Sequence, residues 1–405
     1  MKIALVNNYY YLRGGSERVL FGDQAALSAL GHDVRPFSVR DERNEKSAAD
    51  DLFPEVPDRQ RTGLLNKVSA AAGYVYAPAV GRAFAAFLEH FQPDIVHCHN
   101  IYGRLTTAVL DQARQRDIPT VLTAHDQKLV CPAYLALRSG QPCQLCVDGN
   151  YWRCLRWRCH KNSLPGSLIY TVESYANRWF GKYNAVSRFL CPSNFLRESL
   201  IRSGVDEHRA VYHPNALPAS EYDPKFTAGG YILYAGRLSE EKGLRTLLRA
   251  ALRLPLPLRI AGAGPLEEEL SSEIARRRLP VTLEGHQSGE TLRELFREAA
   301  FTVVPSEWFE NASMAVLESF ACGKPVLATA IGGNPELVIE GETGSLFPAG
   351  DADALADGAR RLGADRSALN RMGRNARRLI EERFNQQRRT EELIGIYQHV
   401  LATQA

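Results

Sequence analysis

The chain has 405 residues, and at roughly 150 residues per domain this length predicts two or three domains. Hydrophobic residues make up 45% and charged residues 23%, ordinary values that exclude collagen-like, coiled-coil and wholly disordered chains. The 49 Lys and Arg nearly balance the 46 Asp and Glu, and a net charge of +3 is too small to make nucleic acid the expected partner.

The chain begins with a short apolar run, at residues 2–7, that predicts a strand and is too short for a signal peptide. We therefore expect a cytoplasmic protein. No stretch reaches the ~20 apolar residues that are needed to cross a bilayer. The nearest, 68–88, contains Pro78 and Arg82, which favours a pair of packed helices over a membrane anchor.

In the first half of the chain, short apolar runs alternate with longer helical patterns, which is typical of a parallel sheet with crossover helices. The predicted strands are 2–7, 33–39, 94–99, 120–124 and 189–192. The predicted helices are 16–30, 79–91 and 103–116. A Pro-containing stretch at 211–223 predicts a linker.

The same alternation returns in the second half. The predicted strands there are 231–236, 258–262, 281–284, 301–304 and 325–329. Two tandem α/β units indicate two doubly wound, Rossmann-like sheets facing across a cleft, with ligands outside the carboxyl ends of the strands. We expect one domain at 1–215 and a second at 216–385, with a last helix, 386–405, that is a candidate to pack back on the first.

The stretch 310–318 follows a predicted strand and opens a helix, which places Glu310 on the loop and Glu318 on the helix. Eight helical residues rise about 12 Å, so the two carboxylates could hold hydroxyl groups at the two ends of an extended ligand. Between them, exposed backbone amides and the helix dipole favour an anion. The amides belong to Asn311, Ala312, Ser313 and Met314. A sugar nucleotide has this layout, whereas the alternative is a capping Glu310 and an exposed surface Glu318.

Two cations, Arg237 and Lys242, also follow a predicted strand. Their spacing across a turn lets both reach one phosphate group. The alternative is a solvated pair that exchanges salt bridges with Glu240 and Glu241.

Two features of the first half are compatible with a ligand. Gly14 and Gly15 follow the first strand and permit positive φ and a close approach of backbone to a ligand, or they form a plain turn. His125 also follows a strand and is either a functional residue or a buried core histidine.

Together, these residues resemble the retaining glycosyltransferases of family four, which have the GT-B fold. The resemblance covers nearly the whole chain and includes 262–265, 305–307, 332–336 and 342–344. It implies transfer of a sugar from a nucleotide-diphosphate donor to a glycan or lipid-linked glycan, which we expect to belong to bacterial polysaccharide synthesis. It also implies retention by front-face attack, with the departing diphosphate accepting the proton of the acceptor.

The resemblance further implies roles for single residues. In that family the residue matching Glu310 contacts donor-sugar hydroxyls, and the one matching Glu318 contacts the ribose. Those matching Arg237 and Lys242 neutralise the diphosphate. The remaining implied positions are Gly14 and Gly15 near the diphosphate and acceptor, His125 near the transferred sugar, and His286 by the nucleobase.

Two patterns point to other chemistries and are disfavoured. Gly262 and Gly264 follow a strand as in a dinucleotide-binding loop, but Glu267 stands where the third glycine would be, against a nicotinamide oxidoreductase. Asp351 and Asp353 have the spacing of a metal-binding acidic pair, but they begin a helix, where Asp is an ordinary cap. No catalytic metal is therefore expected.

An insertion at 131–160 holds five of the eight cysteines. Its candidate ligands for a structural zinc ion or an iron–sulfur cluster are Cys143, Cys146, Cys154 and Cys159, and Cys131 or His160 could replace one of them. Disulfides are less expected in a reducing cytoplasm. Reduced, unligated thiols remain an alternative, because a single CxxC with irregular spacing onward is only a moderate metal signature.

The same region is basic and aromatic. Residues 127–190 hold nine Lys or Arg and two acids, and aromatic and basic residues interleave at 151–158. This pattern suits a membrane interface or an anionic lipid-linked acceptor at the inner face of the cell membrane. The alternative is a solvated loop whose tryptophans cover the metal site.

Two rival functions remain open. An epimerase or hydrolase of nucleotide sugars with the same fold would release free nucleotide without any acceptor. A non-catalytic, metal-stabilised adaptor would bind its partner through the Cys-rich loop, although it would have no need of Glu310 beside an anion site.

Overall fold

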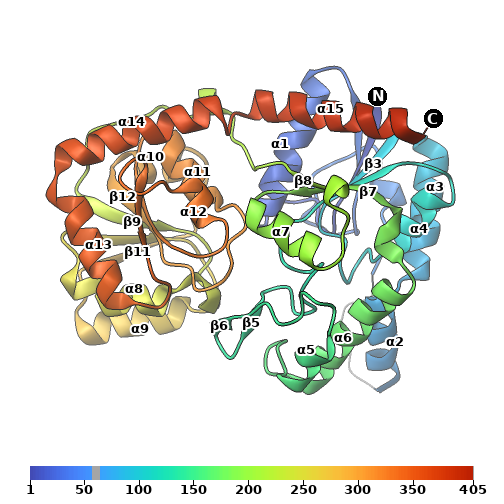
Figure 1. The fold of residues 1–405 in the computed structure, drawn as a ribbon, viewed down its shortest axis with the longest axis horizontal. Coiled ribbons are helices and arrows are strands. Elements are labelled where there is room, and N and C mark those ends of the chain that lie inside the picture. Colours follow the sequence, from blue (N-terminus) through green and yellow to red (C-terminus); the bar gives the residue numbers. More distant parts are fainter. Residues whose placement is uncertain (57–63, 405) are drawn as a thin grey trace. The chain divides into compact units, whose positions relative to one another are not determined.

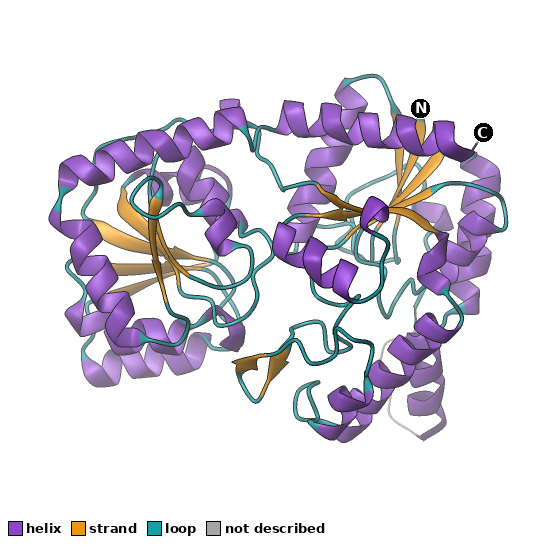
Figure 2. Cartoon of the chain, in the orientation of Figure 1, coloured by secondary structure: helices purple, strands orange, loops and turns teal. Residues whose placement is uncertain are grey.

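The computed structural model describes residues 1–56 and 64–404, so the last residue of the predicted helix 386–405 lies outside it. The chain forms two compact units, each built on a six-stranded sheet (Figures 1 and 2). Unit 1 comprises Met1–Ser139, Cys143–His213 and Thr390–Ala405, and unit 2 comprises Gly140–Pro142 and Pro214–Arg389. The predicted class, two doubly wound α/β domains, is confirmed.

The sheet of unit 1 is parallel throughout, in the order β2-β1-β3-β4-β7-β8. Its strands are β1 (Lys2–Val6), β2 (Asp33–Phe37), β3 (Ile95–Cys98), β4 (Thr120–Thr123), β7 (Val186–Cys191) and β8 (Ala210–Tyr212). Strand β8 lies in the predicted linker 211–223, so that part of the linker prediction is wrong. The strand order reverses between β1 and β3, where sheets of this kind bind ligands at their carboxyl ends.

Helices and short turns cover this sheet. They are α1 (Gly15–Ala29), α2 (Leu64–Val75), α3 (Pro78–Phe91), α4 (Ala108–Arg114), α6 (Leu164–Trp179), α7 (Asn194–Arg202) and α15 (Gln386–Gln404). The stretch 68–88 falls in two helices, and of these α2 contacts α6 and α3 contacts α4. Helix α4 begins later than predicted because Gly103 and Thr106 have left-handed φ, at 72° and 61°.

Helix α15 and the insertion lie outside the six-stranded sheet of unit 1. Helix α15 supplies Leu393, Tyr397 and Val400 to the core of this unit, although it follows unit 2 in the chain. Between β4 and α6, the insertion holds a hairpin, β5 (Leu137–Arg138) and β6 (Gln141–Pro142), and the short helix α5 (Trp152–Arg156).

The sheet of unit 2 is also parallel, in the order β11-β10-β9-β12-β13-β14. Its strands are β9 (Tyr231–Ala235), β10 (Leu258–Ala261), β11 (Val281–Gly285), β12 (Ala299–Val304), β13 (Val326–Thr329) and β14 (Gly344–Phe347). Its helices are α8 (Leu244–Ala250), α9 (Glu267–Arg277), α10 (Gly289–Arg297), α11 (Met314–Ala321), α12 (Asn334–Leu337), α13 (Ala352–Ala364) and α14 (Arg366–Glu382). The order reverses between β9 and β12.

Two apolar clusters form the core of unit 2. Leu233 belongs to one cluster and its neighbours Ile232 and Tyr234 to the other, because alternate residues of a strand point to opposite faces of the sheet. Short 3₁₀ turns occur in both units, at Asp50–Leu52, Lys182–Ala185, Glu207–Arg209, Ala219–Glu221, Glu240–Lys242 and Ala251–Arg253.

Candidate functional site

Lys242 and Glu310 meet at the carboxyl ends of β9 and β12, where the strand order of unit 2 reverses. The Lys242 ammonium donates to Glu310 Oε1 at 2.6 Å and lies 4.8 Å from the centre of the Trp308 ring. The Ser306 hydroxyl donates to the same oxygen at 2.6 Å. Glu310 is only 6% exposed, so this ion pair is largely removed from water.

The surroundings of Glu310 keep its carboxyl group ionised. Burial raises the pKa of Glu310, but the charge and hydrogen bond of Lys242 and the hydrogen bond from Ser306 outweigh it and leave the pKa below its usual range. An ionised carboxylate only accepts hydrogen bonds, which suits it to bind hydroxyl groups. The alternative in which Glu310 caps α11 is wrong, because the N-cap of that helix is Ser313.

Helix α11 begins at Met314, so the prediction of eight helical residues between Glu310 and Glu318 is wrong. The N–H groups of Val316 and Leu317 donate to the Ser313 carbonyl. The N–H groups that come before them, at the start of the helix, have no carbonyl partner within the helix. The amides of Asn311 and Ala312 therefore precede the helix, and those of Met314 and Ala315 lie in its first turn.

Glu318 is held within the unit rather than on its surface. Its side chain lies on α11 and is only 7% exposed, so the alternative of an exposed surface acid is wrong.

Two close backbone contacts fix the position of the ion pair. Gly333 N–H donates to the Glu310 carbonyl at 2.6 Å, and a Cβ on Gly332, which has φ +62°, would lie 2.4 Å from that carbonyl oxygen. Likewise, a Cβ on Gly243 would lie 1.8 Å from the Pro305 carbonyl oxygen. The segments 305–307 and 332–336 therefore hold the Glu310 loop through contacts that leave no room for side chains.

The other donor-site candidates of unit 2 lie outside the ion pair. The exposed Arg237 accepts a hydrogen bond from the Tyr234 hydroxyl on its backbone carbonyl, at 2.8 Å. Glu240 forms a salt bridge with Arg245. This does not support the alternative in which Arg237 and Lys242 exchange salt bridges with Glu240 and Glu241. His286 is exposed just beyond the edge strand β11.

Asp351 caps α13 by accepting hydrogen bonds from two backbone N–H groups, as predicted.

In unit 1, His125 lies at the carboxyl end of β4 and contacts a histidine that follows β3. His125 Nε2 is 2.8 Å from His99 Nδ1, and the two rings stack with their centres 5.1 Å apart. Next to them, His97 has one ring nitrogen 2.6 Å from the Tyr397 hydroxyl of α15 and the other 2.7 Å from the Thr123 hydroxyl. His125 is half-buried, so it is not the fully buried core histidine of the alternative.

Sequence reasoning missed His97 and His99, and their alternation at the end of a buried strand was the available signal. Within residues 1–56 and 64–404, the only group of three or more His, Cys, Asp and Glu residues whose ligand atoms all lie within 4.8 Å of one another is Asp23, His97 and His99. Both ring nitrogens of His97 are already hydrogen-bonded, so we interpret this group as a polar network.

The glycine pair does not use left-handed backbone. Gly14 has φ −169°, which is extended, and Gly15 is the first residue of α1. The positive φ that glycine permits is therefore not used at Gly14. The loop after β1 is held instead by Asn7, whose side-chain amide donates to Glu17 Oε1 at 3.3 Å.

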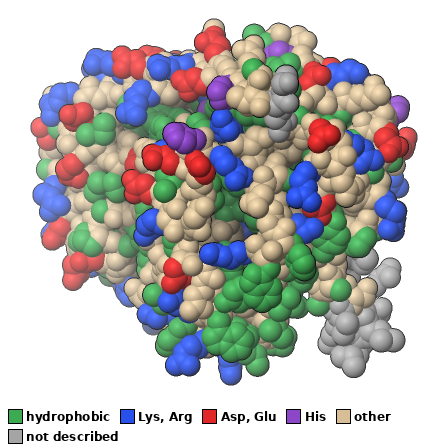
Figure 3. Space-filling model, turned by 45° about the vertical axis from the view of Figure 1, so that its right-hand side comes forward, with side chains coloured by type: hydrophobic (Ala, Val, Ile, Leu, Met, Phe, Trp, Pro, Cys, Tyr) green, Lys and Arg blue, Asp and Glu red, His purple; other side chains and the backbone are tan. Residues whose placement is uncertain are grey.

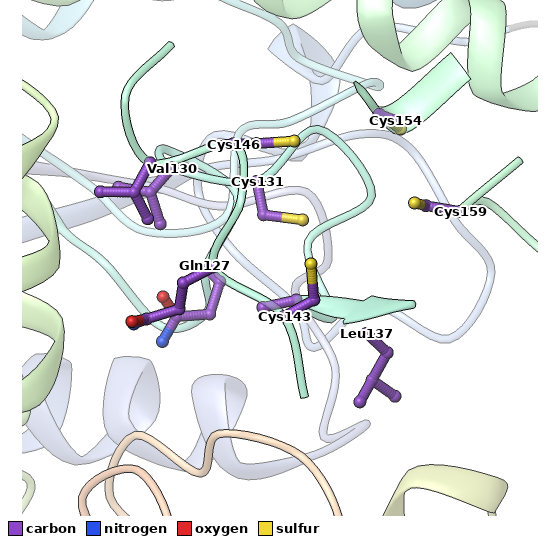
Figure 4. Close-up of a pocket in the computed structure, with 11 residues that line it drawn as sticks. Gln127, Val130, Cys131, Leu137, Cys143, Cys146, Cys154 and Cys159 are labelled. Atoms are coloured by element: carbon purple, nitrogen blue, oxygen red, sulfur yellow. The ribbon is translucent and has the colours of Figure 1, made fainter. Parts of the chain in front are cut away.

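The five cysteines of the insertion line one cavity (Figure 4). They are the predicted Cys143, Cys146, Cys154 and Cys159, together with Cys131, and all are free thiols. Burial raises the pKa of Cys131 to about 12. His160 stacks on Tyr170 at 4.1 Å and is not among the residues that line the cavity.

Residues 13–221 match the profile of a family described as Glycosyltransferase Family 4, and residues 223–379 match one described as Glycosyl transferases group 1. The O-antigen chain mannosyltransferase C of Escherichia coli is 30% identical over 178 residues, which are 43% of this chain and 48% of that protein. The alpha-D-kanosaminyltransferase of Streptomyces kanamyceticus is 30% identical over 176 residues, 42% of this chain and 45% of that protein. The chain thus spans about half the length of these curated relatives.

Solved structures resemble the whole chain. A sucrose-phosphate synthase from Thermosynechococcus elongatus has a TM-score of 0.75 at 21% identity and covers 100% of both chains. Anabaena Alr3699/HepE, solved in complex with UDP, has a TM-score of 0.69 at 18% identity and covers 98% of this chain and 100% of its own. These likenesses establish the GT-B fold. Among the described residues, no helix is both long and apolar enough to cross a bilayer.

Proposed function

Because the chain belongs to Glycosyltransferase Family 4, we propose that it transfers a sugar from a nucleotide-diphosphate donor to a glycan or lipid-linked glycan, with retention of configuration. The observation that carries this proposal is the buried Lys242–Glu310 pair at the reversal point of the unit 2 sheet, beside the start of α11. Anabaena Alr3699/HepE, which shares the fold, was solved with UDP and with UDP-glucose, which supports a nucleotide sugar as the donor.

The charges of unit 2 suit the bond that breaks. Cleavage of a sugar–phosphate bond builds positive charge on the anomeric carbon and negative charge on the departing diphosphate, so fixed cations and amides near the diphosphate lower the barrier. Lys242, Arg237 and the first amides of α11 take this role. In the structure, the Lys242 ammonium donates a hydrogen bond to Glu310. A bound diphosphate would take over the ammonium group and free the carboxylate for the hydroxyls of the donor sugar.

The remaining assignments complete the donor and acceptor contacts. Glu318 binds the ribose hydroxyls, and His286 lies by the base. In unit 1, Gly14 and Gly15 bring backbone close to the diphosphate and acceptor, and His125, positioned by His99, lies near the transferred sugar. The acceptor oxygen attacks the anomeric carbon from the side that the diphosphate leaves, and a diphosphate oxygen takes its proton.

Substitution of Glu310 by Gln tests this proposal, because Gln keeps the size of the side chain and removes its charge. We expect turnover to fall by about 100-fold or more. The control for folding is the melting temperature, compared with that of the matched variant Glu268→Gln, which alters an exposed position on α9. The donor is found first from the thermal stabilisation given by uridine, guanosine and adenosine diphosphates. Normal turnover by Glu310→Gln would contradict the proposal, and release of nucleotide at full rate without acceptor would favour an epimerase or hydrolase.

One surface of unit 1 favours a membrane-bound acceptor. Its exposed apolar residues, which we call the α5–α6 surface, are Trp152, Trp157, Leu164, Leu168, Val172, Trp179 and Phe180. Those at 164, 168, 172 and 179 recur at helical spacing, so they share one face of α6. Figure 3 shows hydrophobic side chains gathered at the lower end of the molecule with Lys and Arg beside them.

The charge of this surface supports an anionic bilayer as its occupant. Arg156, Arg158, Lys161 and Arg178 are exposed in the same segment. Of the two acids in residues 127–190, Asp148 pairs with Arg153 and Glu173 is buried against Lys128. We infer that the α5–α6 surface rests on the cytoplasmic face of the cell membrane, where the chain would extend a lipid-linked intermediate of bacterial polysaccharide synthesis.

Vesicle flotation tests this inference. The full chain should bind vesicles that contain phosphatidylglycerol and bind phosphatidylcholine vesicles weakly. The double variant Leu168→Asp/Trp179→Asp should lose this binding, whereas Leu252→Asp, at an apolar position of unit 2 whose exposure lies between those of Leu168 and Trp179, should retain it. Equal binding by both variants, or no preference for the anionic lipid, would contradict the inference.

A further inference from the structure

The thiol groups of this chain are concentrated in one place. Cys131, Cys143, Cys146, Cys154 and Cys159 line a single cavity of unit 1. Figure 4 shows the sulfur atoms of Cys131 and Cys143 pointing toward one another and that of Cys159 pointing toward the same space. The other three cysteines of the chain lie on strands β3 and β7 and next to α11. Five thiols around one cavity are therefore a feature of the insertion, and the rest of the unit does not share it.

The insertion has little else to hold it in shape. Its buried apolar cluster consists of Ala133, Cys146, Tyr151 and Cys154, and its regular elements are a hairpin with two-residue strands and a five-residue helix. Four of the ten described non-glycine residues with positive φ lie within it, namely Tyr134, Ala136, Ser139 and Arg158, and two more, Lys161 and Asn162, follow it directly. Each such residue costs about 1 kcal/mol or more, so an additional source of stabilisation is required.

We propose that the cavity binds one zinc ion through four of its five cysteine thiolates, with Cys143 and Cys146 as two of the ligands. Sulfur is the ligand type that zinc prefers in closed structural sites, and four thiolates give the tetrahedral coordination of such sites. Each thiol that binds loses its proton to solvent, so uptake of the ion releases protons. The ion is structural, because four protein ligands leave no open position for a substrate.

The sulfur atoms must move closer together when the ion binds. In the described chain, Asp23, His97 and His99 are the only ligand group with all atoms within 4.8 Å of one another, so no three of these sulfurs meet that limit. The contact between the Cys154 and Cys159 thiols also defines the competing arrangement, which is a disulfide between them.

The site goes beyond the proposed glycosyl transfer, because its role is to fix the segment that carries Trp152 and Trp157. Its failure is also distinguishable from failure of that function, because the readout is metal content. The full chain, purified under reducing conditions, should contain about one zinc per chain by elemental analysis. The variant Cys143→Ser/Cys146→Ser should contain almost none, and Cys322→Ser, which alters a buried cysteine of unit 2, should retain the ion.

A second measurement covers the case in which the double variant fails to fold. After removal of zinc, the wild-type chain is titrated with Co²⁺, which should give the charge-transfer and d–d bands of a tetrahedral thiolate site, and these bands should disappear when one equivalent of zinc is added. A wild-type chain without stoichiometric metal that also gives no such bands would overturn the proposal. Recovery of a Cys154–Cys159 disulfide by mass spectrometry, or an iron–sulfur chromophore in the purified chain, would overturn it as well.

Discussion

The Lys242–Glu310 pair should respond unequally to removal of its two charges. The side chain of Glu310 is 8% exposed and that of Lys242 is 22% exposed. The variant Lys242→Met leaves a buried carboxylate without its cation and with hydrogen bonds from the Ser306 and Trp308 side chains, whereas Glu310→Gln leaves an ammonium group that can turn toward water. We therefore expect the lysine variant to be the less stable of the two.

The structure sets the size of this difference. Breaking a buried ion pair from one side costs about 3 to 5 kcal/mol, and we expect the lower end for Lys242→Met because Ser306 still donates to the carboxylate. Loss of one charge-assisted hydrogen bond in Glu310→Gln should cost about 1 to 2 kcal/mol. In the double variant neither charge remains, so it should be more stable than the sum of the single effects implies, by about 2 kcal/mol.

Lowering the pH should reduce the difference in the free energy of unfolding between the wild type and Lys242→Met. The folded-state pKa of Glu310 is depressed, so the stability that its ionised form contributes is present above the unfolded pKa near 4.5 and is lost as the pH falls through the folded value. Without Lys242, burial is no longer opposed by the cation, and protonation of Glu310 relieves the cost of the buried charge. The deficit of Lys242→Met should therefore shrink below about pH 5.

Urea unfolding followed by hydrogen exchange in peptides of unit 2 measures these free energies, because it separates the unfolding of the two units. The reasoning fails if Glu310→Gln is destabilised as much as Lys242→Met. It also fails if the two effects add in the double variant to within about 0.5 kcal/mol, since the charges would then be independent.

Three further predictions follow from contacts elsewhere in the chain. Gly332→Ala should displace the Glu310 loop and abolish nucleotide binding in calorimetry, because its Cβ would lie 2.4 Å from the Glu310 carbonyl oxygen. Gly341→Ala, also at positive φ but with nothing within 4 Å of the added Cβ, should bind the nucleotide normally. Equal affinities of the two variants would refute this. Tyr397→Phe should lower the stability of unit 1 by about 1 to 3 kcal/mol, because a ring nitrogen of His97 loses its hydroxyl partner, and an unchanged thermal transition would argue against that contact. Burial lowers the pKa of Lys324 to about 8 from 10.5, so its buried charge destabilises the fold fully below pH 8 and progressively less between pH 8 and 10.5. The free energy of unfolding of the wild type should therefore rise relative to that of Lys324→Met across that window. A difference that stays constant with pH would contradict this.

The central strands of both sheets could be predicted because a parallel strand with both faces covered appears in the sequence as an apolar run. Strands β8 and β14 were missed, and each is the last strand at one edge of its sheet. An edge strand has a single neighbour and is shorter or less uniformly apolar, as at Ala210–Tyr212 and Gly344–Phe347. The missing information was therefore the pairing partner, which lies elsewhere in the chain.

For the candidate site, the sequence placed Lys242 and Glu310 at strand ends but could not indicate that they touch. They are 68 residues apart, and their contact depends on β9 and β12 being neighbours in the sheet. The start of α11 was also placed too early, because the residues at 311–313 have no pattern that distinguishes a loop from a first helical turn. The contact between His99 and His125 depends in the same way on the pairing order of β3 and β4.

Helix α15 has a consequence for how the protein is made. Its residues Leu393, Tyr397 and Val400 complete the core of unit 1 and are synthesised after all of unit 2. A ribosome therefore finishes all of unit 2 before the amino-terminal unit can close over its sheet. During that interval the apolar side chains of unit 1 that pack against Leu393, Tyr397 and Val400 remain uncovered, and chaperones could bind them.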